Sequence, residues 1–538
     1  MSKVYDVIIV GSGPSGAQAA QTLVEAEVNV LMLDVGEKDE KYAPIVPNVP
    51  FDEFRQNDNE QYRYLLGDEF EAIPFDDIKT GSQLTPPRKH IMRNIEKLIP
   101  LESDTFFPME SLAYGGLGCG WGGGAFVYSD EELQKAGLDV GKIKEAYQIV
   151  GDRIGISGDA GSTKKYSVGE LKNVQPSLKM DNSIEKIYSR YLKHQAKYNQ
   201  KGVFIGPPPM AMLSQDLGER KKTEYYDNDF YTDILQQTYR PWITINNLNK
   251  SSNYTYQAQR LVLRFIEKED FVDVETKNTI SNEIEYFKTK KLILATGAPG
   301  TARIVLRSLS DKIQRLPLLS NPYNYIPCIY PAMLGKPLSK LKTSVAQAVI
   351  YLDETGKNED VLVSSIFTYR SLLLYKLIKE TPLNFCDGRM MMQYLQSAFV
   401  IAGLHFPDSF SESKYYELTK DSNSFTGDKL KAHYVQTEEE KLYYKRKLKS
   451  FKKTLNSFYI YPVKIINPGF GSSIHYAGSV PFSLEEKPGT LSQTGRIHTT
   501  KNVYIADGSG FTFLPAKGIT FSIMANAHCV ANEVLKNN

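Results

Sequence analysis

The sequence predicts an α/β fold in which a domain built on a parallel sheet carries a second, inserted domain. Three observations lead to this prediction. A strand, a glycine-rich turn and a helix occupy residues 4–34, a second strand-to-turn unit lies at residues 291–309, and glycine-rich strand signals return at residues 495–525. Because strands that alternate with helices form parallel sheets, we expect all three regions to contribute to one sheet.

The first unit combines every part of a dinucleotide-binding fingerprint. Val4–Val10 is a continuous apolar strand, and the turn Gly11–Gly16 reads Gly-Ser-Gly-Pro-Ser-Gly. An alanine-rich helix follows, and the second strand, residues 28–34, ends in Asp34. This order is typical of a Rossmann-type domain.

Each position of the fingerprint has an expected role. Gly11 permits the tight turn, Gly13 lets the backbone approach a pyrophosphate, and Gly16 lets the helix pack closely on the strand. The helix N terminus, which includes Ser15, offers free N–H groups and the positive end of its dipole to phosphates. Asp34 is placed to accept a hydrogen bond from a ribose hydroxyl.

A second glycine-rich segment, Tyr114–Phe126, contains seven glycines within ten consecutive positions. Such a segment is neither a stable helix nor a strand interior. A flexible linker is the alternative, but Leu117 and Trp121 between the glycines favour a backbone wrapped around a flat ligand. The expected ligand contacts are Gly115, Gly116, Gly118, Trp121, Gly122, Gly123, Gly124 and Ala125.

Two further units complete the expected binding domain. Residues 291–300 form a buried strand that ends in a glycine turn, and a helix follows over 301–309. Residues 502–508 form a strand that ends in Asp-Gly, and a closing helix begins near residue 519. The ligand contacts expected from these units are Ala295, Gly297, Asp507 and Gly508.

The remaining segments indicate an interleaved chain. A polar stretch at residues 40–100 suits loops and short helices, residues 257–276 alternate as strands do, residues 397–405 form a strand, and residues 437–455 form a charged helix. An NAD domain is usually one continuous block, so three separated glycine turns favour FAD. We expect an FAD-binding domain of residues 1–150, 251–310 and 466–538, and a substrate-binding domain of residues 151–250 and 311–465.

Composition excludes several classes of protein. The 538 residues contain 64 Lys and Arg against 62 Asp and Glu, and this balance argues against a nucleic-acid surface. The four cysteines form no C-x-x-C pair and predict free thiols in a reducing compartment. The first strand begins almost at once, so we expect no signal peptide, and no run approaches the ~18 apolar residues of a membrane span. We expect a cytoplasmic protein, with export beside a signal-bearing subunit as the alternative.

These motifs resemble the glucose–methanol–choline (GMC) oxidoreductase family along nearly the whole chain. The resemblance implies a GMC or p-hydroxybenzoate-hydroxylase-like FAD domain with an inserted α+β substrate domain. Trp121 is similar to a residue of the pyranose oxidase and gluconate- or fructose-dehydrogenase branch. Four segments match motifs of the family in the same order. They are Gly11–Gly16 with Asp34, Gly115–Gly124, Leu292–Ala298 with Arg303, and Gly495–His498 with Asn502–Ser509, Pro515 and Ile523–Ala525.

The resemblance also implies how the cofactor is attached. In several members of that branch, a His precedes the Trp and is bonded covalently to the flavin. Here that position is Gly120, so we expect non-covalent FAD. Cys119, one place earlier, is the alternative attachment point.

By resemblance, His475 in a His-x-x-Gly context is the base that faces the flavin. Oxidation of a carbinol moves a hydride to flavin N5 while a proton leaves the hydroxyl, and imidazole suits that proton. Four of the other histidines are expected to be surface or structural residues: His90, His194, His405 and His433.

The second catalytic residue of the family, a His or Asn before the last helix, is replaced by Gly518. Three explanations are open. Lys517 takes the place of this residue, a residue within 310–465 does so, or the protein catalyses a different reaction. The alternative for Lys517 is a side chain that points to solvent. The main-chain N–H groups of Gly518, Ile519 and Thr520 are expected at the pyrimidine end of the flavin.

We therefore expect an FAD-dependent oxidoreductase that acts on the CH–OH group of an alcohol, sugar or glycoside. An apolar segment, Tyr369–Ile378, has Met390–Met392 nearby. It suits the domain core or a dimer contact, and the alternative is a lipophilic substrate channel or a membrane-surface loop. A third hypothesis is a flavoprotein whose net reaction is not oxidation, because Gly518 provides no second catalytic side chain. No metal site is expected, and the electron acceptor (oxygen, a quinone or a cytochrome) is left open.

Overall fold

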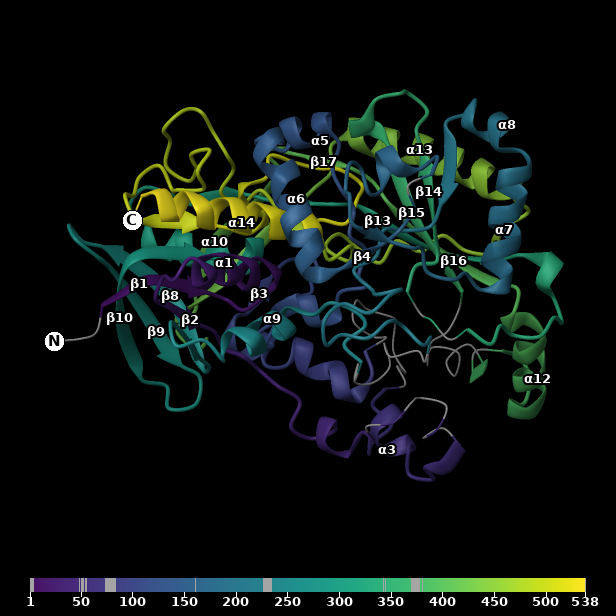
Figure 1. Cartoon of the computed structure of the whole chain (residues 1–538), viewed down its shortest axis with the longest axis horizontal. Coiled ribbons are helices and arrows are strands. Elements are labelled where there is room, and N and C mark those ends of the chain that lie inside the picture. The colour runs from purple at the N-terminus through teal and green to yellow at the C-terminus, as the bar shows by residue number, and fades with distance from the viewer. Residues whose placement is uncertain are drawn as a thin grey trace.

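The computed structural model describes residues 4–47, 49, 53, 56–72, 84–159, 161–225, 235–341, 343, 345–368, 378–379 and 381–537. Residues 369–377, most of the apolar segment noted above, lie outside these ranges. Two large sheets organise the described part of the chain, and helices cover them (Figure 1).

A seven-stranded sheet has the order β7-β2-β1-β10-β9-β8, and β22 also pairs with β10. The pairs that β1 makes with β2 and β10, and the pair of β10 with β22, are parallel. The N-terminal, central and C-terminal regions thus meet in one sheet, which confirms the predicted fold class. The strands are β1 (Val4–Val10), β2 (Val30–Leu33), β7 (Tyr254–Gln257), β8 (Arg260–Glu267), β9 (Val272–Asn278), β10 (Ile284–Leu294) and β22 (Val503–Ile505).

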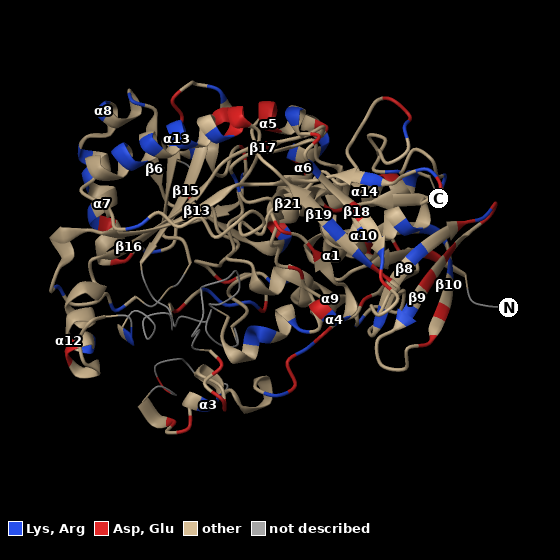
Figure 2. Ribbon diagram, turned by 180° about the vertical axis from the view of Figure 1, so that it is seen from behind, with Lys and Arg blue, Asp and Glu red and all other residues tan. Residues whose placement is uncertain are grey.

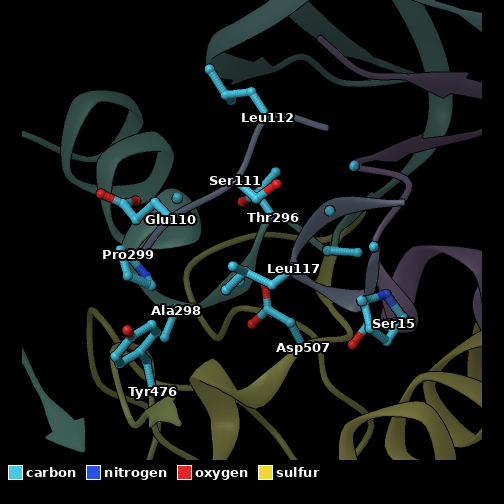
Figure 3. A pocket seen from close by; sticks show the side chains of 18 of the residues that line it. Ser15, Glu110, Ser111, Leu112, Leu117, Thr296, Ala298, Pro299, Tyr476 and Asp507 are labelled. Carbon is cyan, nitrogen blue, oxygen red and sulfur yellow. The ribbon is translucent and has the colours of Figure 1, made fainter. Parts of the chain in front are cut away.

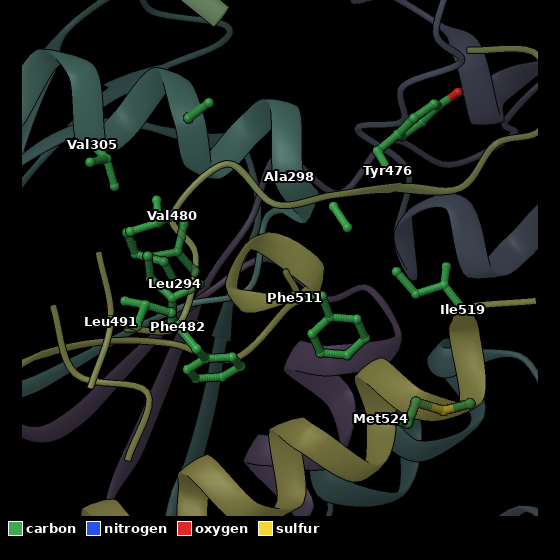
Figure 4. Packing of buried hydrophobic residues seen from close by; sticks show 14 of the residues in the cluster. Leu294, Ala298, Val305, Tyr476, Val480, Phe482, Leu491, Phe511, Ile519 and Met524 are labelled. Carbon is green, nitrogen blue, oxygen red and sulfur yellow. The ribbon is translucent and has the colours of Figure 1, made fainter. Parts of the chain in front are cut away.

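Helices cover both faces of this sheet. On one face α1 (Pro14–Glu25) and α14 (Thr520–Lys536) pack on the apolar side chains of β1 and β2. On the other face α10 (Gly297–Ser308) joins the largest buried cluster. Figure 4 shows part of that cluster, with Leu294, Val305, Val480, Phe482, Leu491 and Phe511 labelled. The cluster reaches Ala298 and Ile519, so the first residues of α10 and α14 rest on a close-packed core.

The second sheet is antiparallel, in the order β20-β13-β16-β15-β14-β6. One of its faces is buried beneath α7 (Asn182–Lys193), α8 (Gln195–Asn199) and α13 (Glu438–Ser457). A capping box of Thr437 and Glu440 begins α13 and satisfies the first free N–H groups of the helix. The strands are β6 (Val203–Gly206), β13 (Tyr323–Ile329), β14 (Ala348–Leu352), β15 (Leu362–Thr368), β16 (Phe399–His405) and β20 (Tyr461–Pro462).

Smaller elements connect the two sheets. The other strands are β3 (Leu101–Glu102), β4 (Ile156–Ser157), β5 (Val174–Gln175), β11 (Arg315–Pro317), β12 (Leu319–Ser320), β17 (Asp408–Ser409), β18 (Lys414–Lys420), β19 (Asp428–Tyr434), β21 (Tyr476–Ala477) and β23 (Phe513–Leu514). Further helices are α3 (Tyr62–Leu65), α4 (Ile95–Leu98), α5 (Asp130–Lys135), α6 (Val140–Ile154), α9 (Pro241–Leu248) and α12 (Phe385–Gln396). A pairing of β3 with β19 joins the two expected domains, whose boundaries stay a prediction.

Figure 2 marks charged residues of both signs along the ribbon, with Lys and Arg on α7, α8 and α13 and Asp and Glu on α5. Within the described ranges, no helix is both long enough and apolar enough to cross a membrane.

Candidate functional site

A cavity of about 330 Å³ opens at the carboxyl ends of three parallel strands. Val10 of β1, Leu33 of β2 and Ala295 after β10 all line it. Figure 3 shows the cavity with Ser15, Thr296, Ala298 and Asp507 around it. The carboxyl edge of a parallel sheet is the usual place for a bound ligand in such folds.

Three helices begin at this cavity. The lining includes Gly13–Ser15 at the start of α1, Gly297–Gly300 at the start of α10, and Ile519–Thr520 at the start of α14. The first N–H groups of a helix have no partner within the helix, and its dipole is positive there. Three converging N termini therefore suit an anionic ligand such as a pyrophosphate.

The glycine turn tests whether the site fits a dinucleotide. A Cβ at Gly16 would overlap the carbonyl oxygen of Gly11, so Gly16 is required for the turn itself. A Cβ at Gly13 would meet no protein atom within 4 Å and would point into open space. The fold alone does not require glycine at position 13, whereas a ligand against that backbone does. The turn therefore fits a pyrophosphate-bearing cofactor.

Asp34 provides a second feature of such a site. Its carboxylate lines the cavity and accepts hydrogen bonds from Ser12 Oγ and from Tyr256 Oη, the latter at 3.0 Å. Burial raises the pKa of Asp34 to about 6, and these two hydrogen bonds oppose the shift. Ser12 Oγ also accepts from the N–H of Gly115 at 2.8 Å and so joins the two glycine-rich segments.

The second glycine-rich segment folds against the first. Gly116–Gly120 forms a short 3₁₀ helix, where we had expected neither helix nor strand, and a Cβ at Gly116 would lie 3.1 Å from Gly13 Cα. Two arginines hold this segment through its carbonyl oxygens: Arg88 donates to Cys119 O at 2.9 Å, and Arg240 donates to Trp121 O. Periodicity and glycine spacing give no signal for these two arginines.

A buried ion pair on the cavity wall also escaped prediction from the sequence. Arg303 of α10 bonds both carboxylate oxygens of Glu110, at 2.5 and 2.9 Å, and both side chains line the cavity. Arg303 was visible only through the family resemblance. Glu110 lies in the 109–113 segment, whose contribution to the cavity no motif indicated.

His475 lines the same cavity, immediately before β21. The preceding residue, Ile474, has a φ of 62°, which is a strained conformation for a β-branched side chain. Such strain costs of order 1–3 kcal/mol and is found where neighbouring structure imposes it, often at functional sites.

A hydrogen-bond network fixes the tautomer of His475. The Nδ2 group of Asn321 donates to the carbonyl oxygens of Phe406 at 2.8 Å and Pro515 at 3.0 Å, and lies 3.5 Å from that of Leu514. Its Oδ1 therefore faces His475 Nδ1, at 3.0 Å, and can only accept. The proton of the neutral ring thus resides on Nδ1, and Nε2 carries the free lone pair. Burial lowers the pKa of His475 to about 4.

Comparisons with known proteins agree with this geometry. Residues 423–527 match the family model described as GMC oxidoreductase. This C-terminal part of the chain is therefore similar to the GMC oxidoreductases. The crystal structure of pyridoxine 4-oxidase from Mesorbium loti is similar over 98% of each chain, with a TM-score of 0.60 and 13% sequence identity, and this likeness shows the fold. A search of curated proteins finds no significant match.

The cavity brings together most of the residues that the sequence predicts to contact the cofactor. Some predicted residues do not line it: Gly16, Gly115, Gly123, Gly124, Ala125 and Gly518. Those that do line it, together with His475, are Gly11, Gly13, Ser15, Asp34, Gly116, Gly118, Trp121, Gly122, Ala295, Gly297, Asp507, Gly508, Ile519 and Thr520.

The predictions for Lys517 are wrong, because its side chain reaches neither the cavity nor solvent. Its side chain is 2% exposed, and its ammonium group pairs with Glu132 Oε2 at 2.6 Å and donates to Val127 O at 3.1 Å. A cation held this way does not replace the missing second catalytic side chain. At Gly518 an added Cβ would lie 3.2 Å from Gly124 O, so the backbone itself fills this position.

Two other side chains differ in their surroundings from what the sequence suggested. Cys119 does not line the cavity, its thiol donates to Tyr114 O at 3.1 Å, and burial raises its pKa to about 11. Its thiol is therefore unsuited to attack a flavin. His405, expected to be structural, stacks on the ring of His475 with 5.0 Å between centroids.

Among the described residues, no cluster of side chains is suited to hold a metal.

Proposed function

We propose that this chain is a GMC-type, FAD-dependent oxidoreductase that oxidises the CH–OH group of an alcohol to a carbonyl. The observation that carries the proposal is the fixed tautomer of His475 in a cavity lined by three helix N termini. Bound FAD supplies the hydride acceptor for such a reaction.

Residues of the chain bind the cofactor, accept the proton and hold the base in place. The N termini of α1, α10 and α14 hold the anionic centre of the cofactor, and Asp34 holds a ribose hydroxyl. Nε2 of His475 accepts the hydroxyl proton as the carbinol loses two electrons and two hydrogens. Asn321 holds the ring so that this nitrogen stays unprotonated and oriented. With Gly120 at the attachment position and Cys119 turned away, we infer that FAD is bound without a covalent link.

A second candidate is a GMC-type flavoprotein whose net reaction is not alcohol oxidation. The observation that favours it is the absence of a side chain at Gly518, with the neighbouring Lys517 committed to Glu132. Two substrate classes stay predictions under the main proposal. Trp121 favours sugars, and the apolar segment around residue 369 favours lipophilic alcohols.

One experiment tests both candidates. The purified full chain is saturated with FAD, made anaerobic and mixed with a panel of primary alcohols, secondary alcohols and sugars, while the flavin absorbance near 450 nm is followed (an approximate band set by the cofactor). Bleaching by an alcohol or sugar supports oxidation. A full panel without bleaching, on protein that dithionite does bleach, favours the second candidate. A chain that binds no FAD overturns both.

A further inference from the structure

A short antiparallel pairing brings Asn321 opposite His475. Strand β12 pairs with β21, and Ser320 lies opposite Tyr476. Asn321 directly follows β12 and His475 directly precedes β21, so the register continues to this pair, whose side chains approach within 3.0 Å. The position of the Ser320 backbone therefore decides whether the Asn321 side chain reaches Nδ1 of His475.

Both backbone groups of Ser320 are held by buried side chains. Its N–H donates to Asp408 Oδ2 at 2.9 Å, and its carbonyl oxygen accepts from the hydroxyl of Tyr434 at 3.0 Å. The side chains of Asp408 and Tyr434 are fully buried. A hydrogen bond to a charged acceptor is roughly twice as strong as a neutral one. We therefore expect Asp408 to contribute more than Tyr434 to holding this peptide.

Asp408 also lies where the carbonyl oxygens that hold Asn321 come together. It belongs to β17, which pairs with β23 through Asp408 and Leu514. The amide group of Asn321 donates to the carbonyl oxygen of Phe406, two residues before Asp408. It also donates to the carbonyl oxygen of Pro515, one residue after Leu514. One carboxylate thus joins the three chain segments that orient the Asn321 side chain.

A buried lysine compensates the charge of Asp408. Lys414 Nζ donates to Asp408 Oδ1 at 2.7 Å and to Glu440 Oε1 at 2.5 Å, and the Lys414 side chain is 0% exposed. Transfer of charges out of water costs free energy that pairing often fails to recover, so a buried ion cluster is weak evidence for stability. None of these three side chains lines the cavity. Their contact with the Ser320 peptide indicates instead a role in fixing one backbone arrangement.

We propose that Asp408 is a positioning residue for the base His475. Held by Lys414, the Asp408 carboxylate fixes the peptide of Ser320, and this peptide sets the side chain of Asn321 against Nδ1 of the ring. Asp408 does not line the cavity and acts only through this series of contacts. The inference rests on the proposed function, because a base is positioned only where His475 accepts the proton of an alcohol.

The test exchanges Asp408 for Asn in the full chain. The carboxylate accepts from Ser320 on one oxygen and from Lys414 on the other, whereas an amide has one oxygen, so Asp408→Asn loses one of the two contacts. Asp360→Asn is the matched control. Asp360 likewise accepts from a buried lysine, Lys447, on one oxygen and from a tyrosine hydroxyl on the other, at 2.8 and 2.6 Å. Denaturant unfolding shows whether the two variants lose comparable stability.

The tautomer of His475 can be measured without any reaction, by ¹⁵N NMR on the full chain with and without FAD. The chain has seven histidines, and His475→Ala identifies the signals of His475. At pH 7 the ring is neutral, because burial lowers its pKa to about 4. We expect Asp408→Asn to lower the ratio of the Nδ1–H form to the Nε2–H form about tenfold, as one weakened hydrogen bond would. An unchanged ratio in Asp408→Asn, or the same change in Asp360→Asn, overturns the inference.

A kinetic measurement connects the tautomer to the chemistry. Anaerobic flavin reduction is followed against the concentration of the alcohol that reduces the native flavin fastest. Asp408→Asn should lower the limiting rate about tenfold, because a loosely held base spends less time in the reactive geometry. The dissociation constant of the alcohol should stay within about twofold of native. An unchanged limiting rate overturns the inference and leaves the proposed function standing. Reduction of the native flavin by no alcohol overturns both.

A second variant keeps the proposal testable where Asp408→Asn does not fold. Tyr434→Phe removes only the hydroxyl that holds the carbonyl oxygen of Ser320. It should lower the tautomer ratio in the same direction by about threefold, since a neutral hydrogen bond is the weaker one. Tyr416→Phe is its control: Tyr416 is as deeply buried and also packs on Phe106, but its hydroxyl has no hydrogen-bond partner among the described residues. An unchanged ratio in Tyr434→Phe, or an equal change in Tyr416→Phe, contradicts the proposal.

Discussion

Asn321 Oδ1 lies 3.0 Å from His475 Nδ1, and the amide nitrogen of the same Asn321 is committed to backbone carbonyls. Asn321 belongs to the segment between β12 and β13, whereas His475 precedes β21, 154 residues later. This one contact determines which ring nitrogen of His475 can accept a proton, and it leads to the first two predictions.

Asn321→Asp should move the acid limb of flavin reduction to higher pH. In the native chain the pKa of His475 is lowered to about 4 by burial, so the ring is neutral and the rate should stay level from pH 7 to about pH 5. A carboxylate at Nδ1 favours the charged imidazolium and raises this pKa. Stopped-flow reduction across pH 4–8 measures the shift. Asn324→Asp, which has no such contact, is the control, and an identical profile for both variants would contradict the assignment.

His475→Ala should slow flavin reduction by roughly 10²–10⁴, the usual range for loss of a general base. FAD content and the unfolding temperature should change little, because among the described residues the side chain makes one hydrogen bond, to Asn321. His433→Ala is the matched control, since His433 is exposed and packs on Tyr415. An unimpaired rate in His475→Ala would remove the base from the mechanism.

Gly13→Ala and Gly16→Ala should separate folding from cofactor binding. At Gly13 an added methyl group meets no protein atom, so the variant should fold with an unchanged apo unfolding temperature and bind FAD at least about tenfold more weakly. At Gly16 the methyl group overlaps the Gly11 carbonyl, so that variant should lose several kcal/mol of stability or fail to fold. Calorimetry and fluorescence titration with FAD give the two quantities. Native FAD affinity in Gly13→Ala would contradict a pyrophosphate at this turn.

FAD affinity should increase as the pH rises from 5 to 7. The pKa of Asp34 is raised from 3.8 to about 6 in the folded apo chain, so its contribution to apo stability is present below pH 3.8 and lost as the pH rises through 6. A ribose hydroxyl favours the ionised carboxylate, and only about a tenth of Asp34 is ionised at pH 5. The predicted change in dissociation constant is therefore up to about tenfold. Asp34→Asn should bind FAD with little pH dependence, whereas a pH-independent native chain would exclude this role.

Lys517→Met should lower stability without changing the chemistry of the folded protein. The substitution leaves Glu132 buried and unpaired, which costs roughly 3–5 kcal/mol. Denaturant unfolding measures this loss, and the double variant Lys517→Met/Glu132→Gln should recover part of it. Flavin reduction per bound FAD should stay within about twofold of native. A much slower reduction in well-folded Lys517→Met would restore Lys517 as a catalytic candidate.

Local sequence patterns predicted several elements of the seven-stranded sheet and its helices. The strand Val4–Val10, the turn that follows it and the helix Pro14–Glu25 occur where the glycine and apolar pattern placed them. The closing helix near residue 519 is also confirmed. These features depend on neighbouring residues, since backbone freedom, apolar runs and helix starts are local properties.

Long-range contacts were beyond the reach of such patterns. Lys517 is close in sequence to residues that line the cavity, but its side chain pairs with Glu132 instead. Arg88 and Arg240 hold the glycine segment from opposite sides of it in the sequence, and no periodicity indicates either one. His405 could not be distinguished from the structural histidines until β16 placed it against His475.

The sequence by itself determined the fold class and the glycine turns at the helix starts, because glycine backbone geometry and apolar runs act over a few residues. Only the tertiary structure decided the tautomer of His475, the position of Lys517 against Glu132 and the buried pair of Arg303 and Glu110. Each of these depends on burial and on hydrogen bonds between residues that lie far apart in the chain, and the energies of such contacts exist only once the core has packed.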